Sequence, residues 1–322
     1  ILPALIVFII SNIAFELSNV FYNAFLPDLS PSEKIGTISG IGWGVGYAGG
    51  LAALIVAMVG FVSPDIPWFN LSRAAGENIR ATNLLVAAWF AFFSLPLFLF
   101  VKVPSKPPDN PGGRLMSQSL SDLLTTFKQI SDYPHLTRLL IARLVYNDGL
   151  VTIFAFGGIY AAGTFNFTFH EIMLFGIVIN VFAGIGAIAM GFLDDRIGGK
   201  TTVQISNIVL ALAVLMAVLS DSRTVFWASG ILIGLFAGPN QSASRSLLGR
   251  FVPEQKENQF FGLFAFSGKL TAFLGPMLLG LFTQWFNSQR AGVFVVVLFF
   301  LAGALILLPL NEAEGIKNAG RK

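Results

Sequence analysis

The first residues that could do chemistry form a polar stripe within the apolar stretch 2–26. Asn12, Glu16, Asn19 and Asn23 follow one another at spacings of four, three and four residues, which places them on one face of a helix. Polar side chains at membrane depth usually face a partner or a water-filled cavity. We therefore expect the stripe to line a path for a solute or a proton. The alternative is a protonated glutamate that is hydrogen-bonded inside a helix bundle.

A second carboxylate lies in the apolar stretch 137–161, where Tyr146 and Asn147 precede Asp148. At about 1.5 Å per residue, Asp148 lies roughly 18 Å from the start of this stretch, near the middle of a bilayer. Loss of solvent favours the neutral form of a carboxylic acid, so Asp148 and Glu16 are the two candidate proton carriers. A salt bridge from Asp148 to Lys269 or Arg143 is the structural alternative.

Cations in two later stretches could meet the opposite end of a substrate. Lys269 lies well inside the stretch 259–286, where it could neutralise a carboxylate or bind a substrate carboxylate, and both roles remain open. Asn240, Gln241 and Arg245 belong to a polar run that is a further candidate part of the pathway. Arg245 is also shallow enough for its side chain to extend to the cytoplasmic surface instead.

The loop GFLDDRIGGK, residues 191–200, joins two apolar stretches. Its glycines and charged residues could fasten neighbouring helices together in one conformation. Gly191 would allow close helix approach, and Gly198 would permit a tight turn. Asp195 and Arg196 can pair with a neighbouring helix end or with each other, while Lys200 would lie at the lipid interface. These residues would then form a clasp, a set of contacts that holds one conformation and separates in another. The alternative is an ordinary charged turn.

The composition predicts that these side chains belong to a polytopic membrane protein. The apolar residues make up 55% of the 322 residues and the charged residues 11%, against roughly 25% charged in soluble domains. Mean hydropathy is +0.74. A soluble fold has too little interior for this much apolar surface, and disordered chains are polar. The absence of cysteine excludes disulfides and thiolate sites, and the dispersed Lys and Arg give no nucleic-acid patch.

Nine stretches are long enough to cross a hydrocarbon core of roughly 30 Å as helices. They are 2–26, 36–62, 83–103, 137–161, 171–193, 202–220, 224–248, 259–286 and 290–310. Strands of a membrane barrel would be far shorter, with polar and apolar residues in alternation. We therefore predict an all-α, polytopic transmembrane helix bundle.

The distribution of basic residues predicts an orientation and a domain organisation. Lys and Arg are concentrated in alternate loops, which the positive-inside rule places in the cytoplasm. In the longest of these loops, a Pro-rich linker precedes apolar residues at helical spacing from 116 to 130, which predicts a short amphipathic helix on the membrane surface. The predicted parts are a partial N-terminal bundle, a linker, a six-helix C-terminal bundle and a cytoplasmic tail, at 1–103, 104–136, 137–310 and 311–322.

A weak internal repeat relates the two ends of the chain. A shift of 222 residues superposes 2–26 on 224–248, and the next span on 259–286, with coincidences such as Pro31 with Pro253 and Lys34 with Lys256. A parallel repeat of six helices is typical of transporters that consist of two like halves. On this basis about nine of twelve helices are present, and three more are expected before residue 1.

The loop 191–200 resembles the loop signature of the major facilitator superfamily, G-x-L-x-D-R-x-G-x-[RK]. Five further segments are similar to the vacuolar amino-acid effluxer-like family within that superfamily: FELSNVFYNAFLPD (15–28), SGIGWGVGYAGG (39–50), YNDG (146–149), NQSASRSLLGRFVP (240–253) and FFGLFAFSGKLTAFLGP (260–276). The resemblance implies a small-solute effluxer, with neutral amino acids as the substrate class. It also implies a bacterial cytoplasmic membrane or a fungal vacuolar membrane as the location.

Together these observations predict a secondary active transporter that moves a small solute by alternating access, coupled to a proton or another ion. Glu16 or Asp148 could meet a substrate ammonium group, and Lys269 or Arg245 a carboxylate. Membrane lipid is the other expected partner, and no metal or other cofactor is predicted. The alternative is a non-transporting scaffold or receptor of the same fold. An enzyme is disfavoured, because the sequence has no Walker, HExxH or GxSxG motif.

Overall fold

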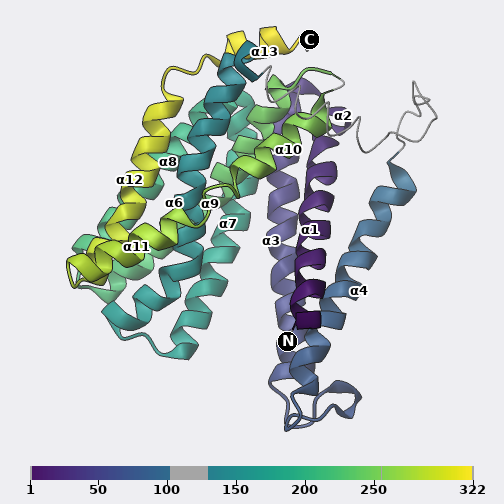
Figure 1. Cartoon of the computed structure of the whole chain (residues 1–322), viewed down its shortest axis with the longest axis vertical. Coiled ribbons are helices and arrows are strands. Elements are labelled where there is room, and N and C mark those ends of the chain that lie inside the picture. Colours follow the sequence, from purple (N-terminus) through teal and green to yellow (C-terminus); the bar gives the residue numbers. More distant parts are fainter. Residues whose placement is uncertain (1, 102–129, 255, 321–322) are drawn as a thin grey trace. The chain divides into compact units, whose positions relative to one another are not determined.

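The computed structural model describes residues 2–101, 130–254 and 256–320, which are almost entirely helical (Figure 1). The long helices are α1 (Leu2–Ala24), α3 (Ile35–Ala57), α4 (Glu77–Phe100), α6 (Pro134–Phe165), α7 (Phe169–Ile197), α8 (Gly199–Leu219), α9 (Arg223–Phe251) and α12 (Gln289–Leu307). The shorter helices are α2 (Leu26–Leu29), α10 (Glu257–Ser267), α11 (Leu274–Trp285) and α13 (Glu312–Ala319). The predicted amphipathic helix falls largely on residues outside the described ranges.

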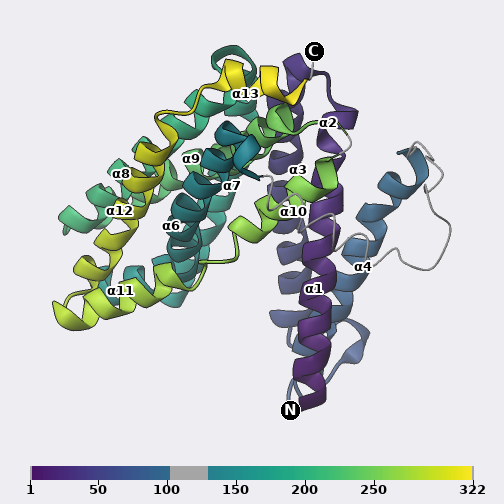
Figure 2. The ribbon, with the colours of Figure 1, turned by 45° about the horizontal axis from the view of Figure 1, so that its top comes forward.

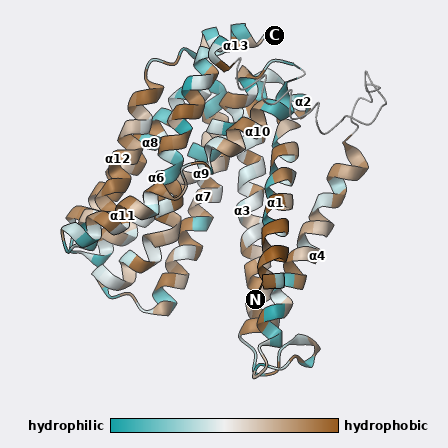
Figure 3. Cartoon of the chain, viewed as in Figure 1, coloured by the Kyte–Doolittle hydropathy of each residue, from teal (hydrophilic) through white to brown (hydrophobic). Residues whose placement is uncertain are grey.

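Seven of the described helical segments are long and apolar enough to cross a membrane. They are Leu2–Leu29, Ser32–Val62, Glu77–Phe100, Pro134–Phe165, Phe169–Ile197, Gly199–Leu219 and Gln289–Leu307. Apolar residues follow the lengths of these helices, and polar residues gather at their ends and in the connections (Figure 3). The predicted fold class, an all-α polytopic helix bundle, is confirmed.

The two other predicted spans differ from the seven in informative ways. The stretch 224–248 lies within α9, a single helix of 29 residues that is too polar to be counted with the seven. The stretch 259–286 is not one continuous helix, because α10 ends at Ser267 and α11 begins at Leu274, close to the kink or hinge that Gly275 and Pro276 predict. The break immediately precedes Gly275 and Pro276. A proline has no backbone N–H and fits most readily in the first turn of a helix, as Pro276 does in α11, although Pro96 and Pro239 lie inside α4 and α9.

The chain is grouped into two compact units, one of residues 1–45 and 120–322 and one of residues 46–119. In the smaller unit the Asn78 side chain, at the start of α4, donates to the Phe61 carbonyl at 2.9 Å. The Trp68 ring packs directly on Gly60, where a side chain would collide with it. These contacts fix the connection between the end of α3 and α4.

In the larger unit, α6, α8, α9 and α12 pack around a core of fully buried aliphatic and phenyl side chains, among them Leu139, Leu210, Leu247 and Phe300. Helix α13 packs against α6 and α9 at one end of this bundle (Figure 2). A second cluster lies elsewhere in the bundle and consists of the aromatic rings of Tyr160, Phe165, Phe167, Phe175 and Phe226. These two clusters hold the helices that carry the candidate site.

Candidate functional site

The break between α10 and α11 is held by polar side chains of α6. The Arg143 guanidinium donates to the Phe264 carbonyl and, at 3.2 Å, to Ser267 Oγ. Asn147 Nδ2 donates to the Gly268 carbonyl at 2.8 Å. Carbonyls at the C-terminal end of a helix lack partners within the helix, and a cation there is favoured by the helix dipole. The α6 side chains therefore stabilise a discontinuous span.

Lys269 lies in this break and forms an ion pair with Glu16 of α1, with 2.8 Å between Nζ and Oε1. The side chains are 64% and 35% exposed, respectively. Of the two roles left open for Lys269, the structure places it as the counter-ion of a carboxylate. The ion pair also means that Glu16, one of the two candidate proton carriers, has a cationic partner in this conformation.

Asp148 differs from Glu16: its side chain is buried, at 1% exposure, and has no cationic partner among the described residues. Neither of its carboxylate oxygens makes a hydrogen bond of normal distance and angle to another described residue. The predicted salt bridges are not formed: Lys269 pairs with Glu16, and Arg143 is bonded to the end of α10. The carboxyl group lies near the hydroxyl of Thr271, which is in the helix break. Asp148 is therefore a buried acid beside a discontinuous helix.

Arg245 does not extend to the surface as the structural alternative predicted. Its side chain is 6% exposed, and Nη1 donates to Oδ1 of Asn23 in α1 at 2.9 Å. Nε and Nη2 donate to the hydroxyl and the carbonyl of Ser39 in α3, at 2.9 Å and 2.8 Å. Gly42 leaves the space that the guanidinium occupies. The alternative was wrong because α1 and α3 cover this part of α9.

The remaining pathway candidates are not brought to the helix break. The Tyr146 hydroxyl shares a 2.7 Å hydrogen bond with Ser244 Oγ, and both groups are buried. Asn240 Nδ2 donates to Oδ1 of Asn207 in α8 at 2.7 Å, inside the C-terminal helices. Asn19 and Gln241 each donate to a carbonyl four residues earlier in their own helix. Among the pathway candidates on α6, Asn147 and Asp148 lie at the break, whereas Tyr146 does not.

In the clasp loop, the Asp195 carboxylate binds the N-terminal end of α3. Its two oxygens accept hydrogen bonds from the backbone N–H groups of Gly36 and Thr37, at 2.7 Å and 2.8 Å. Arg250 joins this contact, since its guanidinium lies 3.0 Å from Asp195 and 2.7 Å from Asp194. A carboxylate at a helix N-terminus satisfies free N–H groups and is favoured by the helix dipole.

A second carboxylate repeats this arrangement at the start of α8. Glu312, in α13, accepts hydrogen bonds from the backbone N–H groups of Gly199 and Lys200, both at 2.9 Å. It also lies 3.4 Å from Arg250. The Lys200 ammonium donates to the Leu308 carbonyl at 2.8 Å. The predicted tail therefore contains a helix that joins the clasp.

The other clasp residues have separate roles. Gly198 adopts φ +90°, a conformation that favours glycine, and lies against the Glu312 carboxylate. Gly191 packs against the backbone of α3 at Gly40, where a side chain would collide. Arg196 is exposed and forms no hydrogen bond or ion pair with the described residues. The sequence analysis did not single out Asp194, Arg250 or Glu312 as part of the clasp. For Asp194, the two consecutive aspartates of the motif could have indicated its role.

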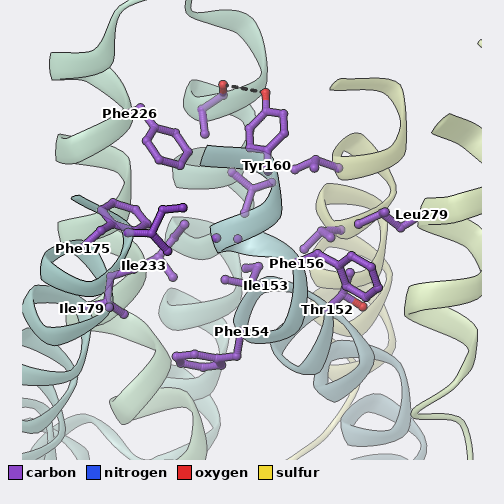
Figure 4. Close-up of a pocket in the computed structure, with 18 of the residues that line it drawn as sticks. Thr152, Ile153, Phe154, Phe156, Tyr160, Phe175, Ile179, Phe226, Ile233 and Leu279 are labelled. Atoms are coloured by element: carbon purple, nitrogen blue, oxygen red, sulfur yellow. Dashed lines mark hydrogen bonds between the residues drawn. The ribbon is translucent and has the colours of Figure 1, made fainter. Parts of the chain in front are cut away.

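A cavity of about 250 Å³ lies among α6, α7, α8, α9, α11 and α12, and its lining is mainly apolar (Figure 4). Phenyl rings of Phe156, Phe175 and Phe226 contribute to its wall. A side chain added at Gly157 or Gly176, which also line it, would meet no other atom within 4 Å. Both positions therefore border open space that a larger side chain would enter.

The cavity is close to Asp148 along α6. Thr152, one helical turn later, lines the cavity and donates its hydroxyl to the Asp148 carbonyl at 2.7 Å. On α11, Gly275 lies against both residues, and Leu279, one turn further on, also lines the cavity. Sequence reasoning missed this cavity, because its walls contain few polar residues.

Comparisons with known proteins identify what this arrangement is similar to. Residues 30–320 match the family model described as vacuole effluxer Atg22 like. The chain is 27% identical over 308 residues to the MFS-type transporter YxiO of Bacillus subtilis, covering 96% of this chain and 71% of that protein. It is 22% identical over 314 residues to autophagy-related protein 22 of Yarrowia lipolytica, covering 88% of this chain and 51% of that one. The chain thus spans about half the length of this fungal relative.

Solved structures show the same fold. The fucose:proton symporter FucP of E. coli superposes with a TM-score of 0.70 at 13% sequence identity, covering 91% of this chain and 73% of that one. The human organic anion transporter MFSD10 superposes with a TM-score of 0.60 at 15% identity, covering 91% and 82%. The helices are therefore arranged as in the major facilitator superfamily.

Proposed function

This chain belongs to the Atg22-like family of vacuole effluxers, and from that membership we propose that the full-length protein is a secondary active transporter for a small solute. The observation that carries the proposal is the buried, unpaired carboxylate of Asp148 beside the break between α10 and α11. Discontinuous helices at membrane depth commonly form the substrate and ion sites of secondary transporters. A receptor or scaffold has no need of an unpaired acid in this position.

The proposed substrates are neutral amino acids, and the proposed direction is efflux. The ammonium group of such a solute would bind the Asp148 carboxylate, since a buried charge is stabilised only by an opposite charge or by hydrogen bonds. The break at 268–273 would supply further backbone partners on the same side of α6. Each substrate would be released when the site opens to the other side of the membrane.

The proposed coupling ion is a proton, and Asp148 is its proposed carrier. An acid that lacks a cationic partner in a buried site is readily kept neutral by a bound proton. Glu16 is less suited to this task in the present conformation, because Lys269 lies 2.8 Å from it.

Alternating access would involve two bundles, at 1–103 and 137–310, that rock about this site. Two contacts would close one side: Asp195 with the start of α3, and Arg245 with Asn23 and Ser39. Both consist of hydrogen bonds that water can replace on opening. Since positive-inside bias places these residues toward the cytoplasm, this conformation would be closed on the cytoplasmic side.

The proposal is tested by measuring solute flux in liposomes that contain the purified full-length protein. We expect saturable uptake of at least one radiolabelled neutral amino acid, above the level in empty liposomes. Asp148→Asn should abolish net uptake driven by a pH gradient, whereas Asp132→Asn, at an exposed position, should leave it unchanged. An absence of saturable flux across amino acids, sugars and nucleosides would favour the receptor or scaffold instead.

A further inference from the structure

We infer that the solute is recognised by an ammonium group attached to a compact apolar body, and that a substrate carboxylate adds nothing to binding. Apolar primary amines should therefore bind at least as tightly as the amino acids that carry the same side chain. The inference rests on the proposed function, in that it places the transported solute at Asp148 and the adjoining cavity. It goes further by naming the chemical groups that this site selects.

The first step is the charge of the site. Asp148 provides a carboxylate with both oxygens unpaired at 1% exposure. Burial of an unpaired charge is costly, so the Asp148 carboxylate holds either a proton or a bound cation, and a solute ammonium can take the place of the proton. A primary ammonium carries three donors, so it can bond both carboxylate oxygens and the nearby Thr271 hydroxyl. The site is thus built to receive a cation.

The second step is that the cations which could bind a substrate carboxylate already have partners. Lys269 is paired with Glu16, Arg143 is bonded to the end of α10, and Arg245 is bonded to Asn23 and Ser39.

The same holds for the two arginines near the aromatic cluster. Arg223 lies 2.6 Å from Glu171 and also over the Phe167 ring, and Arg290 is paired with Asp221. A carboxylate that entered the site would therefore lose its hydration without gaining a charged partner, which is unfavourable.

The third step is the apolar cavity next to Asp148. The polar side chains that line it donate to backbone carbonyls: Thr152 to that of Asp148, Tyr160 to that of Ala217 and Asn180 to that of Gly176. A cavity whose polar groups are satisfied and whose walls are apolar favours an apolar guest. Its phenyl rings would also attract a nearby ammonium through their π faces. Figure 4 shows Thr152 beside Phe156, at the end of the cavity opposite Phe226.

The dimensions limit the size of the solute. An engineered cavity of about 150 Å³ holds benzene, so a cavity of about 250 Å³ accommodates a phenyl or branched aliphatic group with a short chain. The backbone of Asp148 lies one turn from that of Thr152, which is roughly 6 Å along the helix axis, so the carboxyl group lies at least this far from the cavity. A link of two or three carbons between the apolar group and the ammonium matches this spacing.

Three compounds with the same phenyl group test the inference by titration calorimetry on the purified full-length protein. 2-Phenylethylamine carries only the ammonium, 3-phenylpropanoate only the carboxylate, and phenylalanine both. We expect the amine to bind at least as tightly as phenylalanine, and the acid not to bind. Equal binding of the acid and the amine, or binding of phenylalanine at least about tenfold tighter than the amine, would overturn the inference.

Variants assign the effect to this site. Asp148→Asn should weaken amine binding by at least about tenfold, because the loss of a hydrogen bond between two charged groups typically lowers affinity by more than that. Gly157→Leu and Gly176→Leu should block it by filling the cavity, while Asp132→Asn should bind normally. Amine binding that survives both Asp148→Asn and the cavity-filling changes would place the amine elsewhere and refute the inference.

The failure of this inference is distinguishable from failure of the proposed function. Amine-selective binding without any solute flux in liposomes would remove the transport proposal but leave the recognition site. Saturable amino-acid flux with tighter binding of phenylalanine than of the amine would leave the transport proposal and remove the inference.

Discussion

Arg245 donates a hydrogen bond to Asn23 at 2.9 Å, and the two residues are separated by the 222 positions that relate the two copies of the internal repeat. A residue can touch its own counterpart only beside the axis that relates the copies. This contact therefore gives structural support to a repeat that rested on a few coincident residues. It also identifies a place where α1 and α9 meet and would separate if the two halves move.

The contact at Arg245 should control how open this side of the protein is. Arg245→Lys keeps the charge but cannot reproduce hydrogen bonds from three nitrogens, so we expect the closed form to be less populated. These 322 residues contain no cysteine, so Ile35→Cys, at a buried position where α3 packs against Gly249 of α9, can report opening by maleimide labelling. Labelling should be several-fold faster with Arg245→Lys than without it.

The control for this experiment is Arg138→Lys, since Arg138 is on α6 and, among the described residues, bonds only the Pro309 carbonyl. It should leave the labelling rate of Ile35→Cys unchanged. Equal labelling rates for all three proteins would show that Arg245 does not hold the contact closed.

Gly198 should be required for the stability of the clasp loop. With φ at +90°, any side chain is strained there, and a Cβ would also collide with the Glu312 carboxylate. We expect Gly198→Ala to destabilise the protein by about 1–2 kcal/mol or more, measured as a lower melting temperature in detergent. Gly46→Ala is the matched control, because this helical glycine faces open space. An unchanged melting temperature for Gly198→Ala would contradict the loop geometry.

The Asp195 carboxylate should stabilise the start of α3 through its charge as well as its hydrogen bonds. Asp195→Asn keeps an acceptor but removes the charge that faces the helix dipole and Arg250. We expect a loss of about 1 kcal/mol, measured by thermal unfolding. Asp65→Asn, at an exposed position, should have almost no effect. A melting temperature that falls equally in both variants would argue against a specific role for Asp195.

The ion pair of Glu16 with Lys269 is suited to a double-mutant cycle. Because both side chains are partly exposed, we expect a coupling energy of about 0.2–1 kcal/mol in detergent from Glu16→Gln, Lys269→Gln and the double variant. Strict additivity of the two single changes would show that the pair does not form in the dominant conformation.

Much of the fold follows from hydropathy, because a helix in a bilayer must be apolar over its whole length. The break in 259–286 does not follow in the same way. Gly275 and Pro276 mark the region, but the break itself depends on donors from Arg143 and Asn147, which lie more than a hundred residues earlier. A contact between distant segments has no signature in the local sequence.

The candidate site was predictable only in part for the same reason. Glu16, Asp148 and Lys269 stand out as charges in apolar stretches, yet their pairing is a property of the folded chain. Depth alone suggested that Arg245 reaches the surface, whereas α1 and α3 bury it. The sequence did not predict the cavity, because its lining comes from six helices and is mostly apolar.

The coupling role of Asp148 is the central claim, and it is tested most directly by comparing two kinds of flux in the same liposomes. The Asp148→Asn protein should lose accumulation of a neutral solute against its gradient when a pH difference is imposed. Exchange of labelled for unlabelled solute, which needs no proton movement, should persist at reduced affinity. Accumulation at the unsubstituted level in Asp148→Asn liposomes would contradict the account.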